Sequence, residues 1–154
     1  MPSRVGFHKD QDLRENVRVG VIVLTPQEVL LIERFKNNRH YWVFPGGHKR
    51  KGEKLVETAV RELAEETNIK SKEKELTKIL DYFNSYSRQI EVFYLLRLKR
   101  PLSVKIVGEE KTKNSSSNSY QLVWYPLRKL NEIKSSLYSI EARDWLVSYS
   151  LLLG

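Results

Sequence analysis

The hydrophobic positions in the first third of the chain predict a series of short strands. Val17 to Leu24 and Val29 to Phe35 are two runs of β-branched and aliphatic residues separated by a turn-forming segment, a pattern typical of a β-hairpin. The polar segment Lys36 to His40 follows and contains two asparagines, which suit a turn. Tyr41 to Phe44 is then a short apolar strand, which we expect to end at Pro45-Gly46-Gly47.

The segment from Lys54 to Thr67 has a helical period instead. Asn68 follows at the stop position, where a left-handed backbone is usual and asparagine is the best replacement for glycine. The pattern therefore predicts one amphipathic helix ending at Thr67. Its apolar side is expected to consist of Val56, Val60, Leu63 and Thr67, with Ala59 beside them.

The rest of the chain predicts three more strands and a second helix. The strands are expected at Leu76 to Phe83, Ile90 to Leu98 and Gln121 to Tyr125. Asn114 to Ser119 is a low-complexity polar loop, and Ser139 to Leu153 is an amphipathic helix. Because strands and helices are interspersed, we predict an α/β fold with helices packed on a mixed sheet. The residues of the last helix expected to dock on that sheet are Ile140, Trp145, Leu146 and Tyr149.

Composition narrows the class of protein. A chain of 154 residues with 40% hydrophobic and 30% charged residues is expected to form one globular domain over residues 1–154, with residues 1–16 as a loosely held lead-in. No run approaches the roughly 18 apolar residues of a membrane helix, and the N-terminus lacks a secretory apolar stretch, so no membrane partner is expected. Zero cysteines exclude disulfides and thiolate chemistry, and the cytoplasm is the default location.

The chain is basic, with 27 Lys and Arg against 19 Asp and Glu and a formal charge of +8. Such an excess attracts nucleotides, polyphosphates or nucleic acid. Charge alone does not distinguish these ligands, and a solvated basic surface explains the positive charge equally well.

Three glutamates crowd one side of the predicted helix. At 3.6 residues per turn, Glu62, Glu65 and Glu66 fall within an arc of about 100°. Like charges four residues apart destabilise a helix, and the macrodipole disfavours negative charge near the C-terminal end. A sequence that accepts both penalties is expected to bind a cation, and carboxylate oxygens suit Mg²⁺ or Mn²⁺. The alternative is a solvated acidic helix face.

The segment from Gly47 to Ile69 resembles the Nudix box, Gly-x5-Glu-x7-Arg-Glu-U-x-Glu-Glu-x-Gly-U, where U is aliphatic. Only the second glycine differs, as Asn68, at the helix stop position. The flanks resemble the family more loosely. The matching positions are Gly47, Glu53, Arg61, Glu62, Leu63, Glu65, Glu66 and Ile69.

The resemblance implies a Nudix-type pyrophosphohydrolase with an α/β/α sandwich fold and Mg²⁺ or Mn²⁺ as cofactor. Glu62 would ligate metal or act as the base that activates water, and Glu53 would orient the cluster through Arg61. The metal would position the diphosphate and lower the pKa of bound water. The implied metal ligands are the carbonyl of Gly46 and the side chains of Glu62, Glu65 and Glu66.

The family often carries another catalytic glutamate in the loop before a late tryptophan. Aligned on Trp124, that place falls near Asn118 or Ser119, and neither can act as a base. Glu109 or Glu110 could substitute through folding of the loop; otherwise the role of base passes to Glu62.

The substrate-binding candidates are Arg34, Arg39, Gly47 and Tyr86. Arg34 ends a strand that leads into the site and could grip phosphates with Arg39, while Gly47 allows a close backbone approach. Tyr86 stands 17 residues past Ile69, near the place where members acting on dinucleoside polyphosphates often have a tyrosine, and could stack on a base. An ordinary strand-end tyrosine is the alternative.

The leading hypothesis is hydrolysis of a nucleoside triphosphate or a dinucleoside polyphosphate. One alternative is a catalytically idle Nudix-fold module that binds nucleotide or RNA; another is an RNA 5′-pyrophosphohydrolase. The intact glutamate set favours an enzyme. The sequence defines neither the nucleotide, the phosphorus attacked, the physiological metal nor the oligomeric state, for which a homodimer is one alternative.

Overall fold

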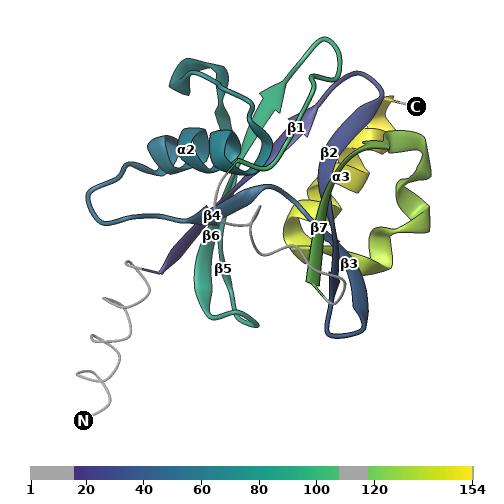
Figure 1. Ribbon diagram of the computed structural model, residues 1–154, viewed down its shortest axis with the longest axis horizontal. Helices are drawn as coiled ribbons and strands as arrows, with labels where there is room; N and C mark the ends of the chain where they lie inside the picture. The colour runs from purple at the N-terminus through teal and green to yellow at the C-terminus, as the bar shows by residue number, and fades with distance from the viewer. Residues whose placement is uncertain (1–15, 108–117, 154) are drawn as a thin grey trace.

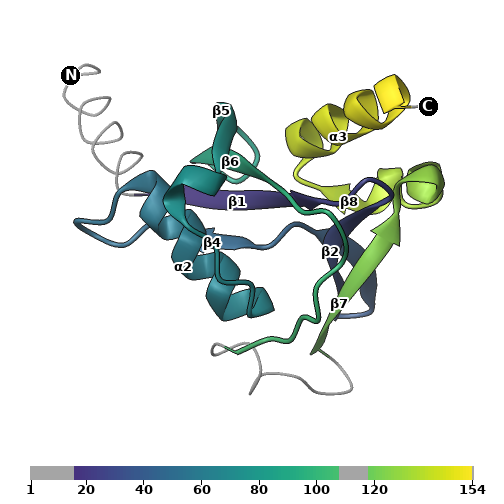
Figure 2. The ribbon, with the colours of Figure 1, turned by 90° about the horizontal axis from the view of Figure 1, so that it is seen from above.

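The computed structural model describes residues 16–107 and 118–153 of the chain. Within that part, eight strands form one mixed sheet in the order β5-β6-β1-β2-β3-β8, with β4 paired to β1 and β7 paired to β2. Helix α2 lies on one face of the sheet and α3 on the other (Figures 1 and 2). The strands are β1 (Val17–Leu24), β2 (Glu28–Lys36), β3 (Arg39–Val43), β4 (Gly46–His48), β5 (Thr77–Asn84), β6 (Gln89–Arg97), β7 (Asn118–Pro126) and β8 (Leu137–Tyr138). The helices are α2 (Leu55–Thr67), α3 (Ile140–Leu153) and the short 3-10 helices η1 (Glu73–Glu75), η3 (Leu127–Glu132) and η4 (Lys134–Ser136).

Strand β1 is buried on both faces, which explains its nearly unbroken apolar sequence. Val19 and Val21 pack with Leu63 of α2 in one core cluster. Ile22, on the other face, packs with Leu146 of α3 in a second cluster. Successive side chains of a strand point to opposite faces, so β1 joins the two layers. The arrangement is the predicted α/β/α sandwich with a mixed sheet, since β1 pairs with β6 in parallel and with β2 and β4 antiparallel.

The predicted hairpin between β1 and β2 forms only at its turn. Leu24 pairs with Val29, and the two strands then diverge. Strand β1 continues beside β6 along its whole length, while β2 pairs with β3 and β7. The prediction was incomplete because an apolar pattern indicates a strand but does not show which neighbouring strand will form most of its hydrogen bonds.

The predicted break is present, because β3 ends at Val43, before Pro45-Gly46-Gly47, but the strand that begins at the two glycines was not predicted. The chain re-enters the sheet there as β4, which pairs Gly46 with Gly20 and His48 with Arg18. A Cβ on Gly46 would lie 2.8 Å from the Cα of Gly20. The glycines therefore permit close approach of two backbones, as glycine within a strand often does.

Helix α2 ends at Thr67 as predicted, and Asn68 adopts the left-handed conformation with φ 65° and donates its backbone N–H to the carbonyl of Ala64. The buried face, however, is rotated from the predicted one. Val56 and Val60 are only partly buried, whereas Glu66 is 8% exposed. The burial of Glu66 was not predicted, because it results from a contact between its side chain and the backbone of β4. The buried residues of the helix are Thr58, Ala59, Leu63, Glu66 and Thr67.

The later elements follow the prediction with two differences. Strand β7 begins at Asn118, because Asn118 and Ser119 pair with Lys36 and Phe35 of β2; the loop predicted for these two residues was wrong. In α3, Leu146 is fully buried, but Ile140 is 48% exposed and does not dock. Residues 114–117, nearly all of the predicted lead-in, Glu109 and Glu110 lie outside the described residues. None of the helices in the described residues is long and apolar enough to cross a bilayer.

Candidate active site

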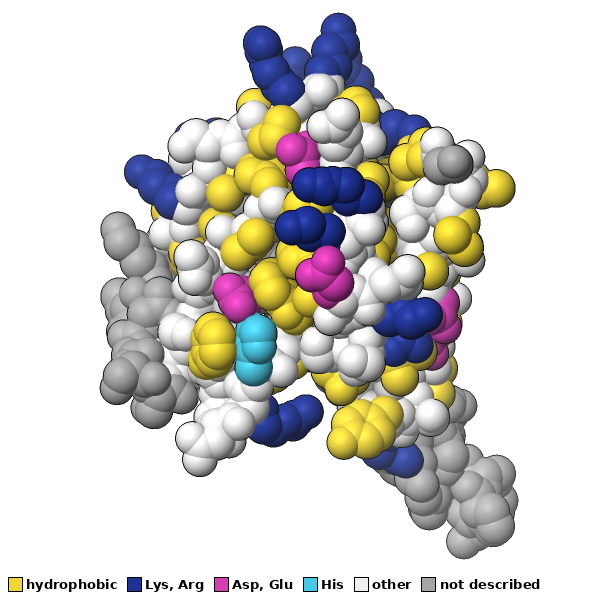
Figure 3. All heavy atoms as spheres, turned by 90° about the vertical axis from the view of Figure 1, so that its right-hand side faces the viewer, with side chains coloured by type: hydrophobic (Ala, Val, Ile, Leu, Met, Phe, Trp, Pro, Cys, Tyr) yellow, Lys and Arg dark blue, Asp and Glu magenta, His cyan; other side chains and the backbone are white. Residues whose placement is uncertain are grey.

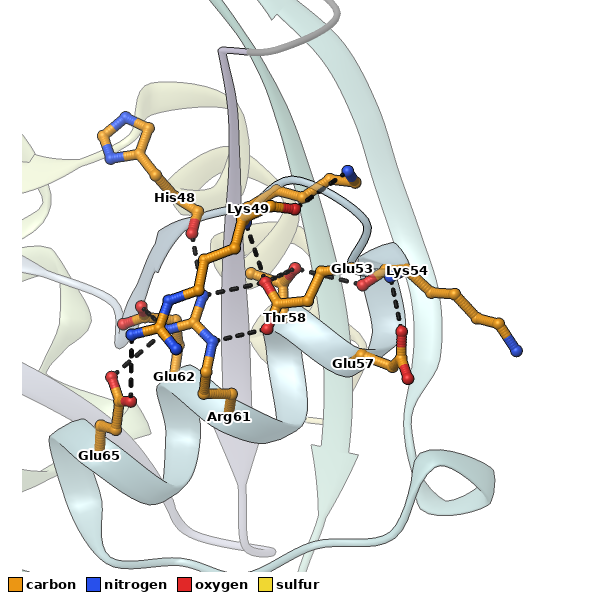
Figure 4. A network of polar contacts seen from close by, with 10 residues as sticks. His48, Lys49, Glu53, Lys54, Glu57, Thr58, Arg61, Glu62 and Glu65 are labelled. Carbon is orange, nitrogen blue, oxygen red and sulfur yellow. Dashed lines mark hydrogen bonds and ion pairs between the residues drawn. The ribbon is translucent and has the colours of Figure 1, made fainter.

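Arg61 organises the acidic cluster on α2 (Figure 4). Its Nε and Nη2 donate to the two oxygens of Glu53 at 2.6 and 3.0 Å. Its Nη1 donates to Glu62 at 2.6 Å and to Glu65 at 3.3 Å. Nη2 also donates to the backbone carbonyl of His48 at 3.0 Å. One guanidinium thus ties three carboxylates to the last residue of β4.

Glu53 is held in one orientation by several donors. Besides Arg61, the backbone N–H of Arg50 and the hydroxyl of Thr58 each donate to its Oε1 at 2.9 Å. Hydrogen bonds from Arg61, together with those from Arg50 and Thr58, lower the pKa of Glu53 to about 2. The contact with Glu53, followed by that with Glu62, raises the pKa of Arg61 above its usual range. The structure therefore places Glu53 where the sequence predicted it, against Arg61.

The remaining glutamates of the box meet the glycines of β4. The backbone N–H of Gly46 donates to Oε1 of the buried Glu66 at 3.2 Å. A Cβ on Gly47 would overlap the carboxylate of Glu62. Glu65 is the most open of the three, with a side chain 38% exposed. The four predicted metal-ligand residues thus come together between α2 and β4.

The donor set fits a hard divalent cation, since it consists of carboxylate oxygens and one backbone carbonyl. The residues that could hold such an ion are Gly46, Glu62, Glu65 and Glu66. Among the described residues, no three histidine or acidic side chains converge closely enough to hold an ion as they stand. The cause is Arg61, which draws Glu62 and Glu65 toward itself while Glu66 faces the N–H of Gly46.

A cationic and aromatic cluster lies on the other half of the sheet, facing the same side as α2. Arg34 of β2 donates from Nη2 to Oδ1 of Asn118 at 3.0 Å, and its guanidinium carbon lies 3.6 Å from the ring centre of Tyr120. Arg34 also lies 5.7 Å, and Arg39 5.5 Å, from the ring centre of Tyr41. The Nε of Arg34 is buried without a hydrogen-bond partner among the described residues.

Sequence reasoning missed Asn118, Tyr41 and Tyr120 as neighbours of Arg34. Arg34 pairs with Tyr41 on one side and with Tyr120 on the other. Only the strand register reveals this, because an offset of one residue would turn each side chain to the opposite face.

Tyr86 is not brought to the site by the structure. It lies in the turn between β5 and β6, where its backbone N–H donates to the side chain of Asn84 at 3.0 Å. Its side chain is 99% exposed, so it rests on no other part of the described protein. A role for Tyr86 in substrate binding stays a prediction.

A buried polar chain that sequence reasoning also missed supports His48 from the opposite face. The Oε1 of Gln89 lies 2.9 Å from the ring Nε2 of His48, and the amide of Gln89 donates to Glu91 at 3.4 Å. Glu91 is 3% exposed and also accepts hydrogen bonds from the hydroxyls of Tyr82 and Ser139. Burial, and then the contact with Glu91, raises the pKa of Tyr82. This chain holds the residue whose carbonyl binds Arg61.

Comparison with known families decides what kind of domain this is. The family model described as "NUDIX domain" matches residues 14–146. The chain belongs to the NUDIX domain family. Its domain is of the Nudix hydrolase type, and the family predicted from the box is confirmed.

Relatives and solved structures agree with this assignment. The chain is 37% identical over 78 residues to "Nucleoside diphosphate-linked moiety X motif 6" of Mus musculus, covering 51% of this chain and 24% of that protein. It is 41% identical over 69 residues to an RNA pyrophosphohydrolase of Pelagibacter ubique, covering 44% of this chain and 42% of that protein. The chain thus spans less than half the length of these curated relatives.

The solved structures confirm the fold. A MutT structure from work on Aliivibrio salmonicida and Vibrio cholerae superposes with a TM-score of 0.63 at 20% identity, covering 90% of this chain and 98% of that one. A C. elegans Ap4A hydrolase superposes with a TM-score of 0.60 at 22% identity, covering 88% and 97%. The predicted Nudix-type α/β/α sandwich is therefore confirmed.

Proposed function

We propose that this Nudix domain hydrolyses a phosphoanhydride bond in a nucleoside diphosphate linked to another moiety, with Mg²⁺ or Mn²⁺ as cofactor. The observation that carries the proposal is the joining of Glu53, Glu62 and Glu65 around Arg61, beside Glu66 and the backbone of Gly46. A nucleoside triphosphate or a dinucleoside polyphosphate is the substrate best suited to it.

Gly46, Glu65 and Glu66 would hold the metal, and Glu62 would serve as the base instead of as a fourth ligand. When bound, the ion would neutralise phosphate oxygens and acidify a water molecule. Arg61 binds Oε1 of Glu62, which leaves Oε2 to accept the proton of the attacking water. Glu53 holds the guanidinium of Arg61 in place, so that Arg61 can position Glu62. Positioning and charge neutralisation are the main requirements of phosphoryl transfer.

Arg34 is the group we assign to the substrate phosphates. Its guanidinium carbon lies over the ring of Tyr120, 3.6 Å from the ring centre. Arginine binds phosphate through a planar fork of N–H groups, and an arginine already fixed by stacking loses less freedom when phosphate binds. Arg39 is a second cation on the neighbouring strand.

We assign the base to Glu62 rather than to the position near the late tryptophan. Asn118 occupies that position and accepts a hydrogen bond from Arg34, so it positions a phosphate ligand instead of removing a proton. Glu109 and Glu110 lie outside the described residues and stay predictions. The cytoplasmic location and the homodimer stay predictions as well.

RNA 5′-end hydrolysis is the second candidate function. The named RNA pyrophosphohydrolase among the relatives favours it over an idle binding module, while the net charge of +8 suits RNA in either case. An idle module is disfavoured because it gains nothing from a cluster of like charges on one helix.

A screen for phosphate or pyrophosphate release tests the proposal. The substrates are nucleoside triphosphates, dinucleoside polyphosphates, nucleotide sugars and 5′-triphosphorylated RNA, each with Mg²⁺, with Mn²⁺ and with a chelator. We expect turnover of at least one nucleotide class that the chelator abolishes. Absence of turnover with every substrate and both metals would contradict the proposal and leave the idle module.

A further inference from the structure

The hairpin of β2 and β3 carries an aromatic surface that the acidic cluster does not use. Phe35 is 43% exposed and is stacked on His40, its register partner, with ring centres 4.3 Å apart and planes only 3° from parallel. The ring of His40 is fixed by Glu33 at 2.7 Å and is backed by Trp42 at 5.8 Å. Cross-strand aromatic pairs stabilise hairpins, but stability does not require that the outer ring stay open to solvent.

Two exposed cations stand at the tip of this hairpin, on the face opposite to the two rings, because successive side chains of a strand point to opposite faces. Lys36 and Arg39 are register partners at the tip of the same hairpin, and both are exposed. Within residues 16–107 and 118–153, the ion pairs include neither of them, while Glu33 is already paired with His40. Figure 3 shows a histidine beside a hydrophobic ring at the lower edge of the molecule, where the surface is notched. An exposed aromatic ring and cations gathered at one hairpin tip are the elements of a single-stranded nucleic-acid surface.

We propose that the tip of the β2–β3 hairpin binds the single-stranded RNA that follows the hydrolysed 5′ end, with a base stacked on Phe35 and phosphates held by Lys36 and Arg39. The inference rests on the proposed function, because Arg34 is the group assigned to the reacting phosphates. Arg34 and Phe35 are successive residues of β2, so their side chains point to opposite faces. A mononucleotide held by Arg34 cannot also stack on Phe35 across the sheet. A polymer that turns round the hairpin tip can reach both.

Turnover of two substrates tests the inference. Phe35→Leu keeps an apolar side chain but removes the ring, and we expect it to lower kcat/KM for a short 5′-triphosphorylated single-stranded RNA about tenfold, through KM, because one stacked base is lost. Hydrolysis of ATP should be unchanged, and Phe35→Trp should restore the RNA reaction. Phe83→Leu is the matched control, since Phe83 is 46% exposed on β5 and should change neither reaction. Equal loss with both substrates, or with both Leu variants, would overturn the proposal.

Binding of a 5′-hydroxyl RNA, which has no phosphoanhydride bond, separates this inference from the proposed function. In fluorescence anisotropy, Phe35→Leu should weaken binding about tenfold. The double variant Lys36→Ala with Arg39→Ala should reduce the slope of log Kd against log salt by about 1.4, the value for two contacts to a single strand. If these changes occur while no substrate is hydrolysed, the RNA surface stands and the catalytic proposal fails. If ATP is hydrolysed and RNA binding is unaltered in both variants, the RNA surface is refuted and the catalytic proposal stands.

Discussion

Arg61 is the residue on which the acidic cluster depends. It contacts the carboxylates of Glu53, Glu62 and Glu65, and Arg50 lies 3.8 Å from Glu65, so three formal negative charges face two positive charges and one remains unbalanced. Glu66 lies nearby against Gly46 and brings a further carboxylate to the cluster. This excess of negative charge is the physical reason to expect a divalent cation in a protein whose overall charge is +8.

The low pKa of Glu53 makes a prediction about stability and pH. Because the folded-state pKa is lowered from 4.5 to about 2, the stabilisation is fully present above about pH 4.5 and is lost as the pH falls toward 2. The Glu53→Gln variant lacks this stabilisation at every pH, because glutamine does not ionise. We expect thermal unfolding of the wild-type protein and of Glu53→Gln to differ most above pH 4.5 and to converge near pH 2. A difference that stays constant over this range would show that the contact with Arg61 does not set the pKa.

At the scale of single elements, those specified by their own residues could be predicted from the sequence. Those that form only through pairing with a distant segment could not. Helix α2 and its Asn68 stop were predictable, because the apolar period and the left-handed cap lie within the segment itself. Strand β4 was not, because three residues containing two glycines become a strand only through pairing with β1. The glutamates to which we assign catalysis and metal binding were therefore found from the sequence, while the contact of Glu66 with Gly46 was not.

The two glycines of β4 should respond differently to alanine. At Gly47 the added methyl group meets the carboxylate of Glu62, whereas at Gly46 it meets the backbone of β1. We expect Gly47→Ala to fold with nearly normal stability but to lose at least tenfold in kcat, because a misplaced carboxylate is a poor catalyst. Gly46→Ala should lower the Tm markedly, because backbone cannot move aside. Calorimetry measures the Tm of both variants. An equal fall in Tm for Gly46→Ala and Gly47→Ala would contradict the different surroundings of the two glycines.

The buried chain from His48 through Gln89 to Glu91 should affect catalysis through position. Gln89→Leu frees the His48 ring and removes one donor to Glu91, and we expect a lower kcat with little change in KM. Tyr82→Phe is the control, since it removes another donor to Glu91 without touching His48. Both variants should lose about 1–3 kcal/mol of stability, but only Gln89→Leu should slow turnover. Equal kcat in the two variants would show that the chain is only structural.

At the scale of the whole molecule, the sandwich depends on helices held to opposite faces of one sheet (Figure 2). The α/β class could be predicted because strands and helices alternate along the chain, and the family could be predicted from the box. The strand order could not, because β1 and β6 pair in parallel although 73 positions separate register partners such as Val19 and Val92. Likewise Arg34 lies beside Tyr120 only because β2 pairs with β7, and no local sequence pattern predicts that pairing.

Attachment of α3 should carry a measurable part of the stability. Leu146 is fully buried in the core beneath the helix, and Leu152 is 88% exposed. We expect Leu146→Ala to lower the free energy of unfolding by about 2–5 kcal/mol and Leu152→Ala to change it by no more than about 0.5 kcal/mol. Denaturant titration measures both. Similar values for the two variants would contradict the packing of α3 described here.

Calorimetric titration of Mn²⁺ into the wild-type protein and into Glu66→Gln tests most directly whether the acidic cluster holds a divalent ion. Glutamine has nearly the same shape and can still accept the N–H of Gly46, so the fold should be retained. The wild-type protein should bind the ion saturably. Glu66→Gln should weaken binding by more than the roughly 10–100-fold lost with an outer-shell partner. Equal affinity in the two proteins, or no binding to either, would contradict the account.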